Sequence, residues 1–310
     1  MSSTIKRNKY EIDMCNGTIM DKLISFSLPL MLSGILQLMF NAVDIIVIGR
    51  FSGSQSLAAV GSTTALINMF TNLFIGISLG ANVLSARFYA AGKDKEMSET
   101  VHTAITLALI SGIIMVFVGL IFAKPVLELM DTPDDVINLS TLYMRIYFMG
   151  MPFFMLYNYG ASILRAVGDT KRPLFYLIVA GIANAGLNMC LVIIFHLGVA
   201  GVAIGTVISQ LISSILVLRC LYRSEISYQL RFSKFKIQNE YLKQIFQVGI
   251  PAGIQSTVIN FSNVLLQSSV NSFGSIAMAG YTAANNIFGF LYVTVNAVTQ
   301  ACMSFTSQNY

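Results

Sequence analysis

Long apolar runs separated by short polar segments are the main pattern along this chain. Each run is at least as long as the ~20 residues that a membrane-spanning helix needs. The runs are continuous and lack the strict alternation of a membrane β-strand, so helices are expected instead of a barrel. The pattern predicts eight spans, at residues 24–48, 57–86, 99–123, 137–161, 173–196, 199–221, 245–270 and 277–305.

Composition supports the same class of protein. Of the 310 residues, 55% are hydrophobic and only 11% are charged, against about 25% charged in soluble domains. These figures exclude a soluble or disordered chain and predict an all-α, polytopic helical membrane protein. The four cysteines (Cys15, Cys190, Cys220 and Cys302) are scattered, which is neither a zinc pattern nor a disulfide framework.

Basic residues predict the orientation in the membrane. With a cytoplasmic N-terminus, 16 of the 19 Lys and Arg residues fall in cytoplasmic segments, and only Arg50, Lys124 and Arg145 fall outside. The positive-inside rule therefore places the N-terminus in the cytoplasm of a cell that inserts the chain in its inner membrane. The net charge of +5 is explained by loops facing anionic lipid, so the expected partner is the bilayer and not nucleic acid.

An internal repeat joins the start of the chain to its end. Ser27-Leu28-Pro29-Leu30 in span one corresponds to Gly249-Ile250-Pro251-Ala252 in span seven, and further matches keep an offset of 220 to 222 residues. Two copies that run in the same direction through the membrane are typical of one class of alternating-access transporter. On this pattern a second set of six spans would end near residue 440, about 130 residues further on.

The repeat predicts a four-part organisation. We expect a cytoplasmic segment at 1–20, a six-helix lobe at 21–222, a basic cytoplasmic linker at 223–244, and the first two helices of a truncated second lobe at 245–310.

Asp44 is the only carboxylate well inside an apolar run. An Asp at the bilayer centre costs ~2.5–3.5 kcal/mol on insertion scales, so such residues are usually functional. Gln37, Asn41 and Asp44 follow each other at spacings of four and three and share one helix face. The stripe predicts a site for a cation or proton, and the alternative is an interfacial carboxylate that faces the outer head groups.

Other spans carry polar pairs at helical spacing. Each pair alone is typical of packing between helices, but together they predict a polar cavity around Asp44. The candidate residues are Asn68 and Asn72 in span two, Tyr143 and Tyr147 in span four, Asn184 and Asn188 in span five, and Thr206 and Gln210 in span six. No Walker loop, HExxH or GxSxG motif occurs, so we expect neither an enzyme nor a cofactor, and coupling to an ion gradient is the simpler source of energy.

At this point the chain resembles the multidrug and toxic compound extrusion (MATE) transporters. Pro29–Gly49, reading PLMLSGILQLMFNAVDIIVIG, is similar to their first helix. Leu164–Pro173, reading LRAVGDTKRP, resembles the loop between their helices four and five. Gly198–Gly201 and Thr206–Ser209 resemble their sixth helix. The resemblance implies a twelve-helix, two-lobe antiporter that exports organic cations in exchange for H⁺ or Na⁺.

The resemblance also assigns residues. It implies that Asp44 is the cation-site Asp of the first helix, with the polar neighbours Gln37 and Asn41, and that Asn184 and Thr206 belong to the same site. Many members carry an Asp where this chain has Asn188, which leaves Asp44 as the expected sole titratable group.

The mechanistic hypothesis is that Asp44, neutralised by a cation or proton, lets span one shift or bend near Pro29 and release substrate. The expected partner is a small organic cation, and no oligomer is expected. The alternatives are a lipid-linked precursor flippase, a receptor or scaffold without transport, and an inactive fragment.

Overall fold

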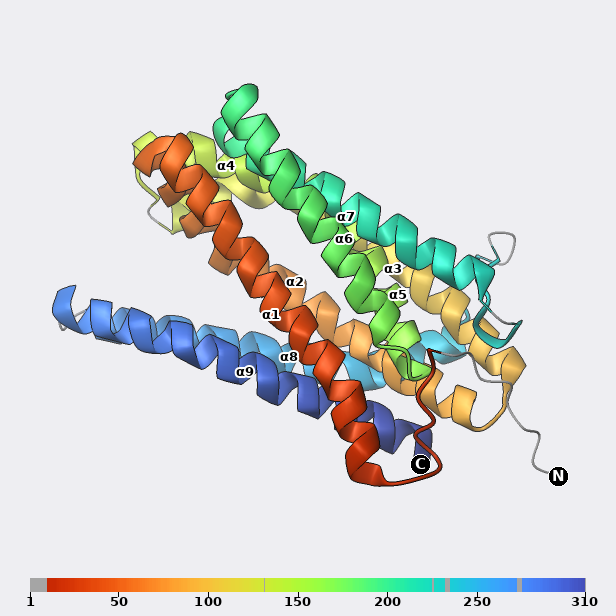
Figure 1. Ribbon diagram of the computed structural model, residues 1–310. Coiled ribbons are helices and arrows are strands. Elements are labelled where there is room, and N and C mark those ends of the chain that lie inside the picture. The colour runs from red at the N-terminus through yellow and green to blue at the C-terminus, as the bar shows by residue number, and fades with distance from the viewer. Residues whose placement is uncertain (1–9, 131, 225, 232–234, 272–274, 310) are drawn as a thin grey trace.

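The computed structural model describes residues 10–130, 132–224, 226–231, 235–271 and 275–309, and these contain helices and no strand. Parts of the predicted segment 1–20 and linker 223–244 therefore lie outside the described residues. The elements are α1 (Ile19–Phe51), α2 (Gly53–Ala90), α3 (Asp94–Leu129), α4 (Asp134–Met149), α5 (Met151–Ala166), α6 (Lys171–Met189), the π-helix η1 (Cys190–Ile194), α7 (Gly198–Arg223), the 3₁₀ turn η2 (Ile226–Tyr228), α8 (Asn239–Asn271) and α9 (Ser275–Asn309) (Figure 1).

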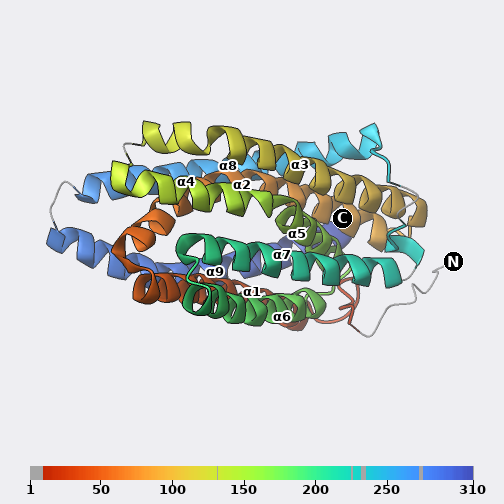
Figure 2. The ribbon, with the colours of Figure 1, turned by 90° about the horizontal axis from the view of Figure 1, so that it is seen from above.

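The all-α membrane fold predicted from the apolar runs is confirmed. Six helical segments of the described chain are long and apolar enough to cross a membrane: α1, α2, α3, α6 with η1, α7, and Phe288–Asn309 of α9. The helices α1 to α7 form a bundle around one apolar core, in which α5 packs between α2, α3 and α7 (Figure 2).

The predicted fourth span is where the helix prediction was wrong. Residues 137–161 were expected to form one helix, but the chain breaks at Gly150 between α4 and α5. Pro152 has no amide hydrogen to continue the hydrogen-bond ladder, and the amides of Phe153 and Phe154 both donate to the Gly150 carbonyl, at 3.0 and 3.1 Å. The break is packed closely, because a Cβ on Gly112 of α3 would lie 2.4 Å from the Pro152 Cα.

Two local features shape the helices that carry the predicted site residues. Helix α1 runs without interruption through Pro29, and the Ser33 hydroxyl donates to the Pro29 carbonyl at 2.8 Å. Helix α6 ends in the wide turn η1, and the chain then reverses through His196 and Gly198, both with positive φ, into α7. The result is an antiparallel hairpin of α6 and α7.

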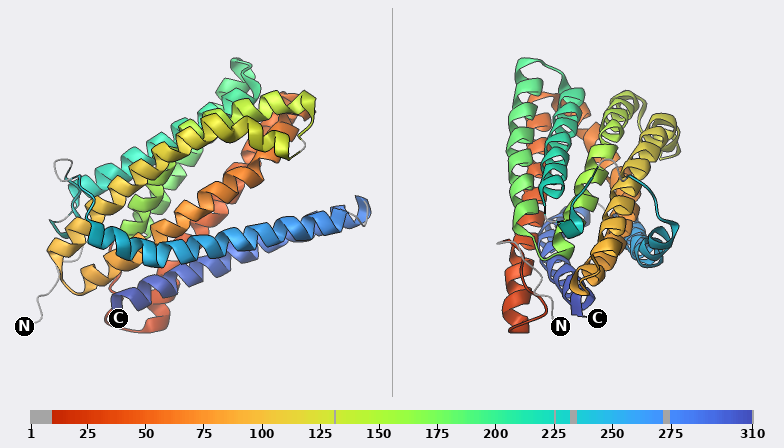
Figure 3. Two further views of the ribbon diagram at one scale, coloured as in Figure 1. Left: turned by 180° about the vertical axis from the view of Figure 1, so that it is seen from behind. Right: turned by 90° about the vertical axis from the view of Figure 1, so that its right-hand side faces the viewer.

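Helices α8 and α9 lie against one end of the bundle and diverge from it toward the other end (Figure 3). The N- and C-termini lie at the end where the helices meet (Figure 1). Helix α8 crosses α2 at two GxxxG motifs, Gly76 with Gly80 on α2 and Gly249 with Gly253 on α8. A Cβ on Gly76 would lie 2.2 Å from the Gly253 Cα, so the two backbones are in direct contact.

We expect Gly76→Ala to push α8 away from α2, because the added methyl has no space at this crossing. Overpacking of this kind costs about 1–3 kcal/mol. Thermal unfolding of the purified chain, followed by size-exclusion chromatography, measures the loss. Gly61→Ala is the matched control on the same helix, since nothing lies within 4 Å of its Cβ position. Equal unfolding temperatures for the two variants would contradict the backbone crossing.

Candidate functional site

A polar cavity of about 400 Å³ lies between α1, α2, α4, α5, α6 and α7. It is lined by most of the residues that the polar stripes singled out, namely Gln37, Asn41, Asp44, Asn68, Asn72, Tyr143, Tyr147, Asn184, Thr206 and Gln210. Side chains from six helices that are separate in sequence therefore converge on one space. Asp44 is the only ionisable carboxylate among the lining residues, and no Lys, Arg or His side chain lines the cavity.

Asp44 is held by a chain of amides. The Asn188 side-chain amide donates to the Asp44 carboxylate and also lies 3.3 Å from the Asn184 Oδ1. The Asn184 amide in turn donates to the Thr206 hydroxyl at 3.4 Å, and that hydroxyl donates to the Val202 carbonyl at 2.9 Å. These hydrogen bonds connect α1 to α6 and α7 along one side of the cavity.

Asn188 does not itself line the cavity, because it is fully buried beneath Asp44. Its side-chain oxygen has no hydrogen-bond partner in the described part of the chain. Gly205 makes this position available, since a Cβ there would lie 2.1 Å from the Asn188 oxygen. Gly181 does the same for the α1–α6 contact, where a Cβ would lie 1.8 Å from the Phe40 ring. Two glycines thus let α1, α6 and α7 approach closely enough to enclose a carboxylate.

An aromatic wall faces the same cavity from α4. The rings of Tyr143 and Tyr147 lie with centroids 6.0 Å apart and planes inclined by 32°. The side-chain oxygen Oε1 of Gln210 is buried nearby without a hydrogen-bond partner among the described residues. The helix break at Gly150 is packed closely against this region, because a Cβ on Gly150 would lie 2.8 Å from that oxygen. The wall therefore presents aromatic faces and an amide acceptor, which suit a cationic or hydrogen-bond-donating guest.

The structure separates the sequence-predicted residues into three groups. Ten of them line the cavity, Asn188 supports Asp44 from behind, and Pro29 lies elsewhere on α1, outside the cavity lining. The polar lining residues that the prediction missed include Thr64, Tyr157, Asn158, Ser209 and Ser213. Ser209 and Ser213 could have been found, because they continue the face of Thr206 and Gln210 at helical spacing.

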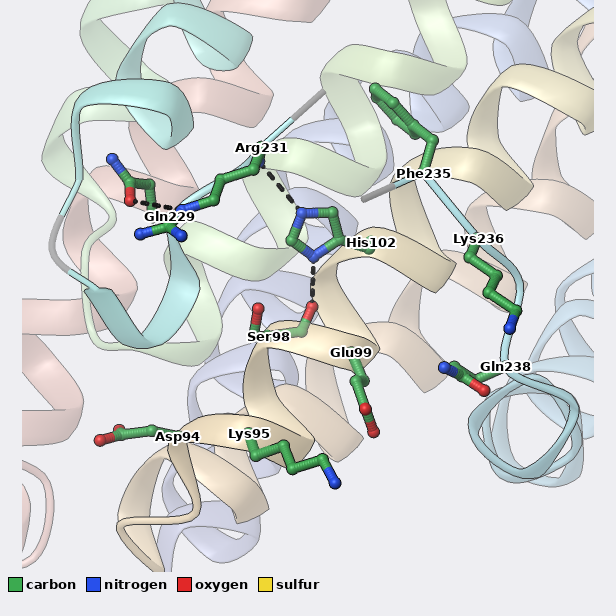
Figure 4. Close-up of a pocket in the computed structure, with 10 residues that line it drawn as sticks. All are labelled: Asp94, Lys95, Ser98, Glu99, His102, Gln229, Arg231, Phe235, Lys236 and Gln238. Atoms are coloured by element: carbon green, nitrogen blue, oxygen red, sulfur yellow. Dashed lines mark hydrogen bonds between the residues drawn. The ribbon is translucent and has the colours of Figure 1, made fainter. Parts of the chain in front are cut away.

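A second pocket, of about 650 Å³, lies at the end of the molecule that carries the termini (Figure 4). It is formed by the first turns of α3 and by Gln229, Arg231, Phe235, Lys236 and Gln238. The buried His102 ring holds these together, since its Nε2 accepts from the Arg231 backbone amide at 3.0 Å and its Nδ1 lies 2.6 Å from the Ser98 carbonyl oxygen. The pocket is bordered by acidic and basic side chains. The hydrogen bonds of the His102 ring attach the segment after α7 to α3.

The loop between α5 and α6 carries a separate buried ion pair. Asp169 is fully buried and accepts from the Arg172 backbone amide at 3.1 Å and from its guanidinium. Burial raises the pKa of Asp169, and the charge of Arg172 opposes that shift. Asp169 contributes to the packing of this loop and does not line the Asp44 cavity, and its carboxylate is already paired with Arg172.

Comparison with known proteins identifies the class. The MatE family model matches residues 29–194. The chain is 32% identical over 293 residues to "Probable multidrug resistance protein YoeA" of Bacillus subtilis (strain 168), covering 92% of this chain and 63% of that protein. It is 28% identical over 301 residues to "Probable multidrug resistance protein YpnP" of the same organism, covering 96% of this chain and 66% of that protein. The chain thus spans about two thirds of the length of these curated relatives.

The fold agrees with the sequence match. A solved structure described as "Outward-facing conformation of a multidrug resistance MATE family transporter of the MOP superfamily" superposes with a TM-score of 0.89 at 23% identity, over 97% of this chain and 67% of that one. The fold and the sequence match together define a multi-pass helical membrane protein. The chain belongs to the MATE family.

We expect Gly205→Ala to displace the Asn188 amide from Asp44, with a loss of about 1–3 kcal/mol in the free energy of unfolding. Gly186→Ala on α6 is the control, because nothing lies within 4 Å of its Cβ position. Adding Asn188→Ala to the Gly205→Ala variant should recover part of the loss, since the clashing oxygen is gone. Thermal unfolding of the wild type, Gly205→Ala, Asn188→Ala and the double variant completes a double-mutant cycle, and strictly additive losses would show that the two residues do not touch.

Proposed function

We propose that this chain forms the ion- and substrate-binding part of a secondary antiporter that exports organic cations and drugs in exchange for H⁺ or Na⁺ by alternating access. The observation that carries the proposal is the charge pattern of the cavity: a single carboxylate, Asp44, among neutral polar and aromatic side chains, with no basic residue among those that line it. Such a cavity attracts cations and gives an anion no partner.

Asp44 can serve both the coupling ion and the substrate because one carboxylate in a low-dielectric space favours one positive charge at a time. A proton or Na⁺ on Asp44 removes the attraction for a cationic substrate. The Asn188 amide can donate to the ionised carboxylate, and its free oxygen can turn toward a bound cation. Tyr143 and Tyr147 then offer ring faces to an organic cation. Competition at Asp44 is the coupling step of this proposal.

The arrangement of the helices supports a cavity that faces one side of the membrane. Asp44 lies in the half of α1 that is distant from the termini, whereas α8 and α9 meet the bundle at the end that carries them. With the N-terminus in the cytoplasm, as the basic residues predict, the molecule is closed toward the cytoplasm. Bending of α1 at Pro29 is the proposed movement that changes the cavity.

The relatives are named for multidrug resistance, which supports drugs as the substrate class. The rival function, a flippase for lipid-linked precursors, needs basic residues to hold a pyrophosphate. Arg145, the candidate for that role, is exposed to the surroundings and does not line the cavity. The cavity therefore favours cation export over lipid flipping.

Asp44→Asn should abolish ion-coupled efflux, because the amide cannot exchange charge with either ligand. The measurement is resistance of cells expressing the complete gene product to cationic dyes, together with efflux from energised vesicles. Asp134→Asn is the matched control, since Asp134 is an exposed carboxylate on the outer side of the same bundle. Unchanged efflux in Asp44→Asn would sink the proposal.

The coupling ion is tested in proteoliposomes loaded with a fluorescent organic cation. We expect an imposed pH gradient or an imposed Na⁺ gradient to drive efflux in the wild-type protein, and neither to drive it in Asp44→Asn. A protein without transport activity would leave the dye inside under both gradients, which is the outcome expected of a scaffold or receptor.

A further inference from the structure

The described N-terminal residues form a strap across one end of the molecule. The Glu11 carboxylate accepts from two tyrosines, Tyr89 at the end of α2 and Tyr228 in η2, both at 2.6 Å. One residue further, the Ile12 amide donates to the Gly168 carbonyl at 3.1 Å. A Cβ on Gly168 would lie 2.5 Å from the Ile12 carbonyl oxygen, so the strap lies directly on the α5–α6 loop. Tyr10–Cys15, here called the strap, is thus fixed to the seven-helix bundle.

The same strap also binds α9. The Met14 side chain is buried against Ala297 and Ala301 of α9. The Asn309 amide donates to the Met14 carbonyl at 3.0 Å, and the Cys15 thiol lies 3.6 Å from the Gln308 carbonyl oxygen as its donor. One six-residue segment therefore holds both the bundle and the last helix.

A polar stripe on α9 continues this contact into the interior. Gln300, Ser304 and Gln308 are spaced by four residues and share one helix face. Gln300 accepts from Arg165 at 3.0 Å, Ser304 donates to Asn82 at 3.1 Å, and Gln308 donates to the Ala166 carbonyl at 2.6 Å. The partners lie at the cytoplasmic ends of α2 and α5, as the predicted orientation has it.

These contacts are confined to one end of α9. Among the residues whose side chains are described, the hydrogen bonds that join α9 to the rest of the molecule involve only its last ten positions. The part of α9 nearer its start exposes Phe288, Leu291 and Val295 by more than half. The polar contacts therefore join α9 to the bundle at the terminus-bearing end. Beyond them Val293 of α9 packs against Gly34 of α1, and the ribbons separate further along, as Figure 3 shows.

We propose that the strap and the polar stripe of α9 form a latch that keeps the terminus-bearing end closed, and that Glu11 is the residue that holds it. The latch deepens the proposed function, because alternating access requires this end to open, but its contacts exist whether or not the chain transports anything. Polar bonds suit this role, since water can replace them when the end opens, whereas an apolar seal would lose its contacts without compensation.

The hydrogen bonding of Arg165, which contacts the polar stripe of α9, supports a latch that opens and closes. The Arg165 side chain donates to Gln300 through Nη1, while its Nε is buried without a hydrogen-bond partner among the described residues. Closing the latch therefore leaves one donor of a cation unsatisfied. Water reaching Arg165 on opening would satisfy it, which lowers the free-energy difference between the closed and open ends.

Cysteine accessibility tests the latch without measuring transport. Ala301→Cys, in a background with the four native cysteines changed to Ser, places a reporter on α9 at a fully buried position in the apolar cluster that includes Met14 of the strap. In lipid nanodiscs, we expect Glu11→Ala to raise the rate of labelling by a water-soluble maleimide roughly tenfold or more, because two hydrogen bonds to a charged group are lost. Ser307→Ala is the matched control on α9, since its hydroxyl donates to its own helix at Met303.

A second variant and a second reporter keep the test decisive. Tyr89→Phe with Tyr228→Phe removes the two tyrosine hydroxyls that donate to Glu11 while keeping the rings, and should raise the labelling rate in the same direction even where Glu11→Ala impairs folding. Met155→Cys reports on the fully buried core of α5 and should stay unlabelled. An unchanged rate at position 301 in both variants overturns the latch, and so does an equal rise at position 155, which would indicate general loosening. Neither result depends on the outcome of Asp44→Asn.

Discussion

The contact between the Asp44 carboxylate and the Asn188 amide is the interaction around which this fold is arranged. A carboxylate among apolar helices needs a donor, and a buried amide needs a partner. To meet, they require α1 and α6 to approach, and Gly205 of α7 leaves the space that the Asn188 side chain occupies. The α6–α7 hairpin, its wide last turn and the close α1–α6 contact all serve that approach. The cavity therefore lies where the helices pack around one buried carboxylate.

Small residues set the geometry elsewhere in the molecule as well. At the α2–α8 crossing the glycines of two GxxxG motifs bring backbone against backbone, which suits a bilayer in which apolar side chains gain little by leaving lipid. Bulky residues fill the core of the seven-helix bundle. The boundary between that bundle and α8–α9 also contains apolar contacts, such as those of Ile245 and Ala301, but it adds glycine crossings and polar bonds. The first kind of contact resists change and the second tolerates sliding or opening.

The sequence predicted most of this wherever the signal was local. Continuous apolar runs located the helices, and polar positions at helical spacing located ten of the cavity residues. The break at Gly150 was missed, because the apolar run continues through it and the interruption depends on Pro152 packing against Gly112. The GxxxG motifs on α2 and α8 can be found in the sequence, but their contact cannot be predicted from it, since no local pattern pairs residue 76 with residue 253. The role of Glu11 could not be predicted from local sequence, because the tyrosines that donate to it are 78 and 217 residues away.

The strap has a consequence for the order in which the chain is made. Met14 leaves the ribosome well before Asn309, whose side-chain amide donates to the Met14 carbonyl from 295 residues further along the chain. At a synthesis rate of about 5–20 residues per second, roughly 15–60 seconds separate the two. During that interval the strap can bind partners in the bundle, among them Tyr89, Gly168 and later Tyr228. Closure of this end is consequently a late event of biogenesis, completed only after the last described helix has been inserted.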